Sequence, residues 1–213
     1  MCKKISYLFL FLLICVLFSA QVCEAYSTYN YRNFDTLISQ LKRDWLIPDT
    51  KGTTYTQDDY TKSYAEINWF SWNSFDTAKD FVLSMNVSWR SASSTPNTFN
   101  SGCGLVFREN GNSDYLYASL RMDGRLYFQG ARNGRNLSYG DYYYGRYSLE
   151  ATHNLTIIAN DTNVNILVDG KQLANVRDVA INRSGWMGFS VSSGTNKDFG
   201  TWCQFTNVHY YVW

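Results

Sequence analysis

Residues 81–90 read FVLSMNVSWR, a stretch in which apolar and polar side chains alternate. Phe81, Leu83 and Met85 begin one apolar row, which continues to Trp89, and the even-numbered positions from Ser84 onward are polar. A period of two with one apolar face is typical of a β-strand that covers a core on one side only. The stretch therefore predicts a strand of a layered β-protein.

The chain after residue 90 continues as short apolar segments separated by Gly, Asn and Asp turns. Asp123-Gly124 is a two-residue hairpin signal, and Asp169-Gly170 marks another turn. Further strands are predicted at 64–72, 103–108, 115–122, 125–129, 154–159, 164–168, 185–192 and 201–212. Residues 130–148, rich in Gly, Arg, Asn and Tyr, are predicted as a long loop or an irregular sheet edge. About ten to twelve strands without a core helix predict an all-β, two-sheet antiparallel sandwich.

The segment 26–62 has a different pattern. Apolar residues fall at helical spacing, with Asn33 or Asp35 as a candidate N-cap and Pro48 beyond the end. They are Phe34, Leu37, Ile38, Leu41 and Trp45. We expect a short amphipathic helix here, then a polar loop at 49–62. The domain organisation expected is an N-terminal segment at 26–62 and a single sandwich domain at 63–213, on which that segment could pack.

Residues 1–25 carry the features of a signal peptide. Lys3 and Lys4 supply positive charge, Ile5 to Leu17 form an apolar core, and Ala25 offers a small residue for cleavage. That core is short for a membrane span, although a retained anchor helix is the alternative. No second apolar run of spanning length follows. We therefore expect a secreted protein, extracellular or periplasmic, without a membrane span after cleavage.

Export determines how the cysteines are interpreted. Cys2, Cys15 and Cys23 would leave with the signal peptide, so the mature chain keeps Cys103 and Cys203. In an oxidising compartment these two predict one disulfide, and two separate buried thiols are the alternative. Two cysteines and two distant histidines match no zinc spacing, so no metal or other cofactor is expected.

Charge and aromatic content narrow the partner classes. The chain has 19 Lys and Arg against 18 Asp and Glu, a formal net charge of +1, without the basic stripe expected of a nucleic-acid-binding protein. Its 213 residues include 17 Tyr and 7 Trp. These side chains combine an apolar ring with a polar tip and suit contacts with sugars or proteins, although aromatic residues also favour β-structure in general.

The order of the segments resembles a known superfamily. After residues 81–89 come Gly104-Leu105-Val106-Phe107-Arg108, Ile166-Leu167-Val168-Asp169-Gly170, and Gly185-Trp186-Met187-Gly188-Phe189. This set is similar to the concanavalin A-like lectin/glucanase superfamily, and within it to laminin-G-like modules and the domain named after 3-keto-disaccharide hydrolases. The resemblance covers about residues 81–211. It implies a jelly roll of two curved antiparallel sheets, a fold that hosts many unrelated functions.

The carboxylates give little support to catalysis. Glycoside hydrolysis needs a pair of them, and the glucanases of the superfamily carry two Glu and one Asp at alternating spacing on one strand. Here Glu66, Glu109 and Glu150 are far apart, and the aspartates cluster in turns, where they bond local backbone. His153 and His209 have no motif-like Ser or Cys neighbour. We predict no catalytic residue; a carboxylate pair assembled from distant loops is the alternative.

A candidate ligand-binding patch lies on outward positions of three successive predicted strands. It combines aromatic rings with Arg and amide donors, the mixture with which proteins bind sugar C–H faces and hydroxyls. Its members are Arg108, Tyr115, Tyr117, Arg121, Tyr127 and Gln129. The loop tyrosines could form its rim, namely Tyr139, Tyr142, Tyr143, Tyr144 and Tyr147. The alternative is that these side chains only pair across strands and keep the sheet soluble.

The functional hypothesis from the sequence is an exported, non-catalytic domain that binds carbohydrate or a glycosylated extracellular partner. Two alternatives stand beside it: a glycoside-cleaving enzyme of the same fold, and a structural or adhesive protein without a sugar site. Five Asn-x-Ser/Thr sequons are possible glycan acceptors if the chain passes through a eukaryotic secretory pathway. They begin at Asn86, Asn136, Asn154, Asn160 and Asn182.

Overall fold

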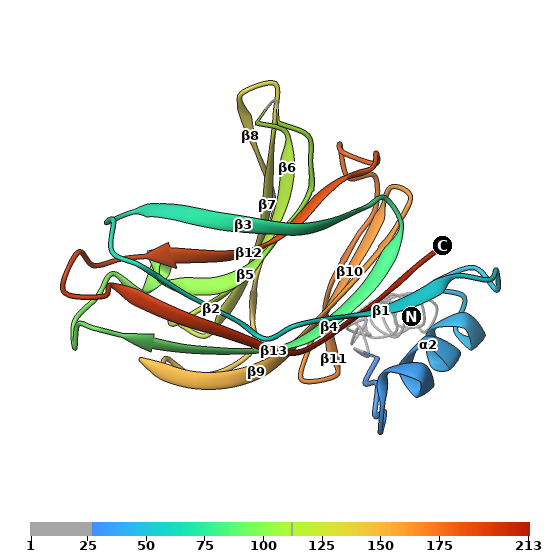
Figure 1. Ribbon diagram of the computed structural model, residues 1–213, viewed down its shortest axis with the longest axis horizontal. Helices are drawn as coiled ribbons and strands as arrows, with labels where there is room; N and C mark the ends of the chain where they lie inside the picture. The colour runs from blue at the N-terminus through green and yellow to red at the C-terminus, as the bar shows by residue number, and fades with distance from the viewer. Residues whose placement is uncertain (1–26, 112) are drawn as a thin grey trace, which may run out of the picture.

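Two antiparallel β-sheets face each other across a common apolar core (Figure 1). The computed structural model describes residues 27–111 and 113–213, so the expected signal peptide at 1–25 lies outside the described residues. Among the described residues, no helix is both long enough and apolar enough to cross a membrane.

The larger sheet has seven strands in the order β1-β13-β4-β9-β10-β11, with β2 also paired to β13. Its strands are β1 (Thr53–Gln57), β2 (Tyr60–Tyr64), β4 (Phe81–Ser91), β9 (Glu150–Asn160), β10 (Asn163–Val168), β11 (Lys171–Val176) and β13 (Thr201–Val212). The last strand of the chain thus lies between the first strands and β4, so segments distant in the sequence are hydrogen-bonded neighbours.

The smaller sheet has six strands in the order β3-β12-β5-β6-β7-β8. They are β3 (Trp69–Ala78), β12 (Gly185–Ser193), β5 (Gly102–Glu109), β6 (Tyr115–Arg121), β7 (Arg125–Arg132) and β8 (Arg135–Tyr143). A 3-10 turn, η1 (Thr98–Asn100), precedes β5. All pairings within both sheets are antiparallel, which confirms the two-sheet jelly-roll sandwich.

The alternation in β4 sets the core as predicted. Phe81, Leu83 and Met85 are fully buried in the main cluster between the sheets, where they meet residues such as Leu105 and Phe107 of β5. Because successive side chains of a strand point to opposite faces, the other face of each sheet turns away from this core.

The disulfide is confirmed and joins the two sheets. Cys103 lies in β5 and Cys203 in β13, with their Cα atoms 5.8 Å apart and 100 positions between them in sequence. Both cysteines are fully buried in the main core. The bridge therefore fixes one sheet to the other through the middle of the sandwich.

The N-terminal helix is also confirmed. Helix α2 (Phe34–Arg43) begins at its N-cap Asn33, whose side-chain oxygen accepts a hydrogen bond from the Thr36 N–H at 2.9 Å. Its apolar face packs against the outer face of the seven-stranded sheet in a second buried cluster, beside β1 and β4 in Figure 1. The expectation for Trp45 was wrong: it follows the helix, has a positive φ of 59°, and is 85% exposed.

Some expected loops are strands. Residues 49–62 contain β1 and part of β2, and the expected domain boundary near residue 63 falls inside β2. Residues 130–148 contain β8, the predicted strand 64–72 is interrupted between β2 and β3, and β11 was not predicted. β1 is largely exposed, and β2 and β8 bring only partly buried tyrosines to the core. Their sequences therefore lack a regular apolar row, and pairing with β13 or β7 defines them.

Candidate functional site

The outer face of the six-stranded sheet carries the candidate site. Strand register fixes which residues share it: Ser190 pairs with Gly104, Gly104 with Ser119, and Ser119 with Tyr127. Their neighbours along each strand belong to the core, so this row points away from it. We term this surface the six-strand outer face.

Small residues occupy the middle of the six-strand outer face. Gly102, Gly104, Ser119, Ser190 and Ser192 lie at adjoining register positions of β12, β5 and β6. At Gly104 a Cβ atom would collide with the carbonyl oxygen of Ala118, so the position excludes any side chain. The middle of the face therefore carries only hydrogen atoms and short hydroxyl side chains.

Aromatic rings from β3 extend over these small residues. β3 and β6 have two strands between them, and at ordinary strand spacing they lie about 14 Å apart. Even so, the rings of Phe70 and Tyr117 stack with centroids 5.1 Å apart, and Trp72 lies 6.0 Å from Tyr115. The side chains must lean toward each other across β12 and β5. This cover explains why Ser119 and Ser190 are 0% exposed on a face outside the core.

Polar atoms without a partner gather beneath this cover. Among the described residues, five buried side-chain polar atoms have no hydrogen-bond partner, and four belong to this face: Tyr117 Oη, Ser119 Oγ, Arg121 Nη1 and Ser190 Oγ. Tyr117 and Arg121 flank Ser119 along β6, and Ser190 lies beyond Gly104. An unpaired buried polar atom costs about 1–3 kcal/mol, and native proteins contain few. Four at neighbouring positions indicate a site that binds a polar group.

Arg121 lies between two aromatic rings. Its guanidinium carbon is 3.6 Å from the ring centroid of Tyr127 and 4.1 Å from that of Phe99, which η1 supplies. Such cation–π contacts stabilise a cation that has left water. Burial lowers the pKa of Arg121, while the carboxylates of Asp123 and Asp141 act in the opposite direction.

The structure brings together five of the six residues predicted for the patch. Tyr115, Tyr117 and Arg121 of β6 and Tyr127 and Gln129 of β7 all lie on the six-strand outer face, with Tyr117 opposite Gln129 in register. Tyr115, Tyr127 and Gln129 are half-buried, whereas neighbouring side chains bury Tyr117 and Arg121. Burial raises the pKa of the Tyr115 hydroxyl.

The expectation that Arg108 faces outward was wrong. It is fully buried near the end of β5, where its positive φ of 55° turns the chain. Its guanidinium donates to the carbonyl oxygens of Lys79 and Ile181 at 2.9 and 2.7 Å, and it pairs with Asp80 at 3.5 Å. Arg108 therefore holds loops together and does not join the patch.

Most tyrosines of residues 139–147, expected at the rim of the patch, pack against the protein. Tyr139 stacks on the core ring of Phe128, Tyr142 packs against the same core, and the Tyr144 hydroxyl donates to the Arg121 carbonyl oxygen. Tyr143 and Tyr147 are exposed.

Residues that the sequence interpretation missed complete the face. Ser119 and Ser190 lie at outward positions of predicted strands, a signal that was available but weak, because serine is common on solvated faces. Phe70 and Trp72 lie on β3, and nothing in the sequence places β3 beside β12. Phe99 is in a loop, and no sequence pattern marks it.

Two carboxylates lie at the β6–β7 end of the face. Asp141 lies opposite Tyr127, and its Oδ2 is 3.0 Å from Nη1 of Arg125. Asp123 accepts the backbone N–H of Arg125 at 3.1 Å, and burial raises its pKa. Both are thus engaged by one arginine of the hairpin. The described residues contain no group of three or more His, Cys, Asp or Glu that could hold a metal ion.

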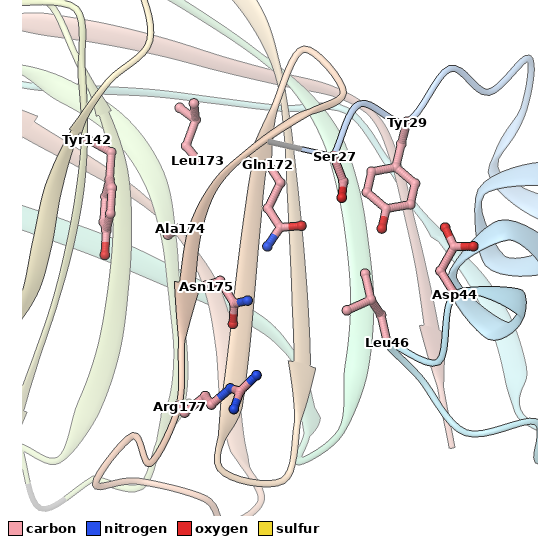
Figure 2. Close-up of a pocket in the computed structure, with 10 residues that line it drawn as sticks. All are labelled: Ser27, Tyr29, Asp44, Leu46, Tyr142, Gln172, Leu173, Ala174, Asn175 and Arg177. Atoms are coloured by element: carbon pink, nitrogen blue, oxygen red, sulfur yellow. The ribbon is translucent and has the colours of Figure 1, made fainter. Parts of the chain in front are cut away.

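A separate cavity of about 850 Å³ lies between the N-terminal segment and β11 (Figure 2). Figure 2 shows Asp44 and Leu46 on one side and Asn175 and Arg177 on the other. Its lining residues are Ser27, Tyr29, Asp44, Leu46, Tyr142, Gln172, Leu173, Ala174, Asn175 and Arg177. None of them is among the described residues that have an unpaired buried polar atom. The six-strand outer face is therefore the better-supported site.

Solved structures with a similar fold include a carbohydrate-binding module. Carbohydrate-binding module CBM66 from Bacillus subtilis is similar with a TM-score of 0.54, over 73% of this chain and 92% of the module, at 13% identity. A fructosyltransferase from A. japonicus has a TM-score of 0.49 at 15% identity, over 82% of this chain and 28% of the enzyme. Sheep galectin-11 has a TM-score of 0.45 at 11% identity, over 68% of this chain and 98% of the galectin.

No protein-family model matches the chain, and no curated protein matches its sequence. The structural likeness establishes the fold. The chain has the two-sheet jelly-roll fold that its motifs indicate.

Proposed function

We propose that this protein binds carbohydrate through the six-strand outer face. The observation that carries the proposal is the group of four unpaired buried polar atoms beneath a cover of aromatic rings. A ligand that supplies hydrogen-bond partners there relieves a cost that the unliganded protein bears.

A sugar can contact both the aromatic rings and the polar groups of the six-strand outer face. The half-buried rings of Trp72, Tyr115 and Tyr127 are the surfaces that a ligand meets first, and they suit the apolar C–H faces of a sugar ring. Gln129 and Arg121 offer planar donors to hydroxyl groups, and the serine hydroxyls can donate or accept. The likeness to CBM66, a carbohydrate-binding module by its name, supports the same ligand class.

The proposed role is non-catalytic and extracellular. Asp141, one of the two carboxylates at the end of the face, forms an ion pair with Arg125, which disfavours its use in an acid–base pair with Asp123. A buried disulfide between the sheets suits an oxidising compartment. The partner is a glycan, free or carried by an extracellular glycoprotein.

A glycan array probed with the purified protein tests the proposal, followed by titration of the best ligand. We expect Tyr127→Ala and Gln129→Ala each to weaken binding, with roughly a tenfold loss for Tyr127→Ala because it removes a stacking ring. Trp45→Ala is the matched control, since it removes an exposed aromatic ring beside the other sheet. Absence of glycan binding, or equal losses in all three variants, would contradict the proposal. Release of reducing sugar would instead support the enzymatic alternative.

A further inference from the structure

The two arginines that are buried among the described residues have very different surroundings. Arg108 donates to two carbonyl oxygens and pairs with Asp80, so its charge is compensated within the protein. Arg121 is 7% exposed and forms no ion pair with any described residue, and its Nη1 has no hydrogen-bond partner. A buried charge ordinarily requires a partner of opposite charge together with hydrogen bonds.

The aromatic contacts of Arg121 compensate its charge only in part. Tyr127 and Phe99 face the guanidinium through their rings and leave its N–H groups without acceptors from those contacts. The carboxylates of Asp123 and Asp141 favour the charge of Arg121 from a distance, but neither forms an ion pair with it. Asp141 pairs with Arg125 through its side chain, and Asp123 accepts the Arg125 backbone N–H.

The four unpaired atoms of the six-strand outer face can all donate. Arg121 Nη1 is a donor only, and the hydroxyls of Tyr117, Ser119 and Ser190 each carry one hydrogen. The hydroxyls can also accept, but the guanidinium can only donate, so its missing partner is an acceptor of negative charge. The group that accepts from several such donors at once is an oxyanion, and charge-assisted hydrogen bonds of this kind are about twice as strong as neutral ones.

We propose that the ligand of the six-strand outer face is an acidic carbohydrate whose carboxylate or sulfate group binds Arg121. This inference rests on the proposed carbohydrate-binding function and specifies its substrate class. The anion reaches the guanidinium when the ring of Phe99 moves aside. That ring is half-exposed on the short turn η1, so its displacement opens no part of the core.

Matched pairs of ligands test the proposal on the wild-type protein. Oligogalacturonate is compared with its methyl ester, and carrageenan oligosaccharides, whose only charged groups are sulfates, with their desulfated forms, by titration calorimetry. We expect the acidic member of at least one pair to bind tenfold or more tightly than its neutral counterpart. The first pair identifies a carboxylate and the second a sulfate.

Two variants test whether Arg121 causes the preference for the acidic ligand. Arg121→Gln should reduce binding of the acidic ligand to the level of the neutral one. Arg125→Gln, the exposed arginine of the same hairpin, should retain the preference. Equal binding within both pairs, or a preference that survives in Arg121→Gln, would overturn the inference while carbohydrate binding itself stood. Failure of every glycan to bind would instead remove the proposed function.

Discussion

At Ser119 and Ser190, ligand binding and protein stability favour different side chains. Each is fully buried on the six-strand outer face, and neither hydroxyl has a partner among the described residues. Alanine at either position would fill nearly the same volume without a polar atom. Selection for folding alone gives no reason to keep the hydroxyls, whereas a ligand that bonds to them does.

We therefore expect Ser190→Ala to raise the free energy of unfolding by about 1 kcal/mol, because it removes an unpaired buried hydroxyl. Ligand binding should weaken at the same time. Urea denaturation followed by far-UV circular dichroism measures the first effect.

Ser193 of the same strand is the control for this prediction. It is equally buried, but its hydroxyl donates to the Thr195 carbonyl oxygen at 2.7 Å. Ser193→Ala should lower the free energy of unfolding by about 1 kcal/mol. A loss of similar size in both variants would show that the Ser190 hydroxyl has a partner after all.

Arg108 and Arg121 show how reliably the alternation of a strand predicts the direction in which a single side chain points. Both were assigned to outward positions of predicted strands, and for Arg121 this was correct. At Arg108 the backbone turns through a positive φ, which directs the side chain into the protein. Alternation holds only while the strand is regular, and an irregularity of this kind is invisible in the spacing of apolar residues.

At the scale of elements, helix α2 depends on its cap and on its docking face. Asn33 accepts from the Thr36 N–H at 2.9 Å and from the Thr36 hydroxyl at 2.7 Å. Phe34, Leu37, Ile38 and Leu41 are buried against the seven-stranded sheet. The cap satisfies a backbone donor that the first turn leaves free.

Asn33→Ala should lower the free energy of unfolding by about 1 kcal/mol, because no side-chain oxygen then accepts the Thr36 N–H. Asn33→Asp should stay within about 0.5 kcal/mol of the wild type, since aspartate caps equally well and suits the helix dipole. Chemical denaturation of the three proteins measures both differences. Equal losses in the two variants would refute the capping role.

Prediction succeeded for elements that have an apolar face. β4 and α2 each bury one regular row of side chains, so a period of two or of 3.6 marks them directly. β1 and β8 bury no such row and were assigned to loops. Their backbone hydrogen bonds to β13 and β7 define them, and sequence spacing carries no record of those partners.

At the scale of the whole molecule, the Cys103–Cys203 bridge restrains the unfolded chain. It closes a loop across 100 sequence positions and ties β5 to β13 inside the core. A loop of this length corresponds to about 4–5 kcal/mol of stabilisation in the chain-entropy model.

The double variant Cys103→Ala/Cys203→Ala should therefore lose about 3–5 kcal/mol of unfolding free energy. Alkylation and peptide mass analysis establish the state of the wild type. Peptides containing Cys103 and Cys203 should gain label only after denaturation and reduction, because both sulfurs are paired and buried. Labelling of the native, unreduced protein would contradict the bridge.

The sequence by itself determined the strand-rich sandwich, the N-terminal helix, the disulfide partners and five of the six patch residues that share a face. These depend on side-chain periodicity, local capping and cysteine number, which neighbouring residues encode. Only the tertiary structure decided that Phe70 and Trp72 cover the small residues of β12 and β5, and that Arg121 is buried without an ion pair. Those features arise from which strands lie side by side, and contacts between distant segments leave no periodic trace in the chain.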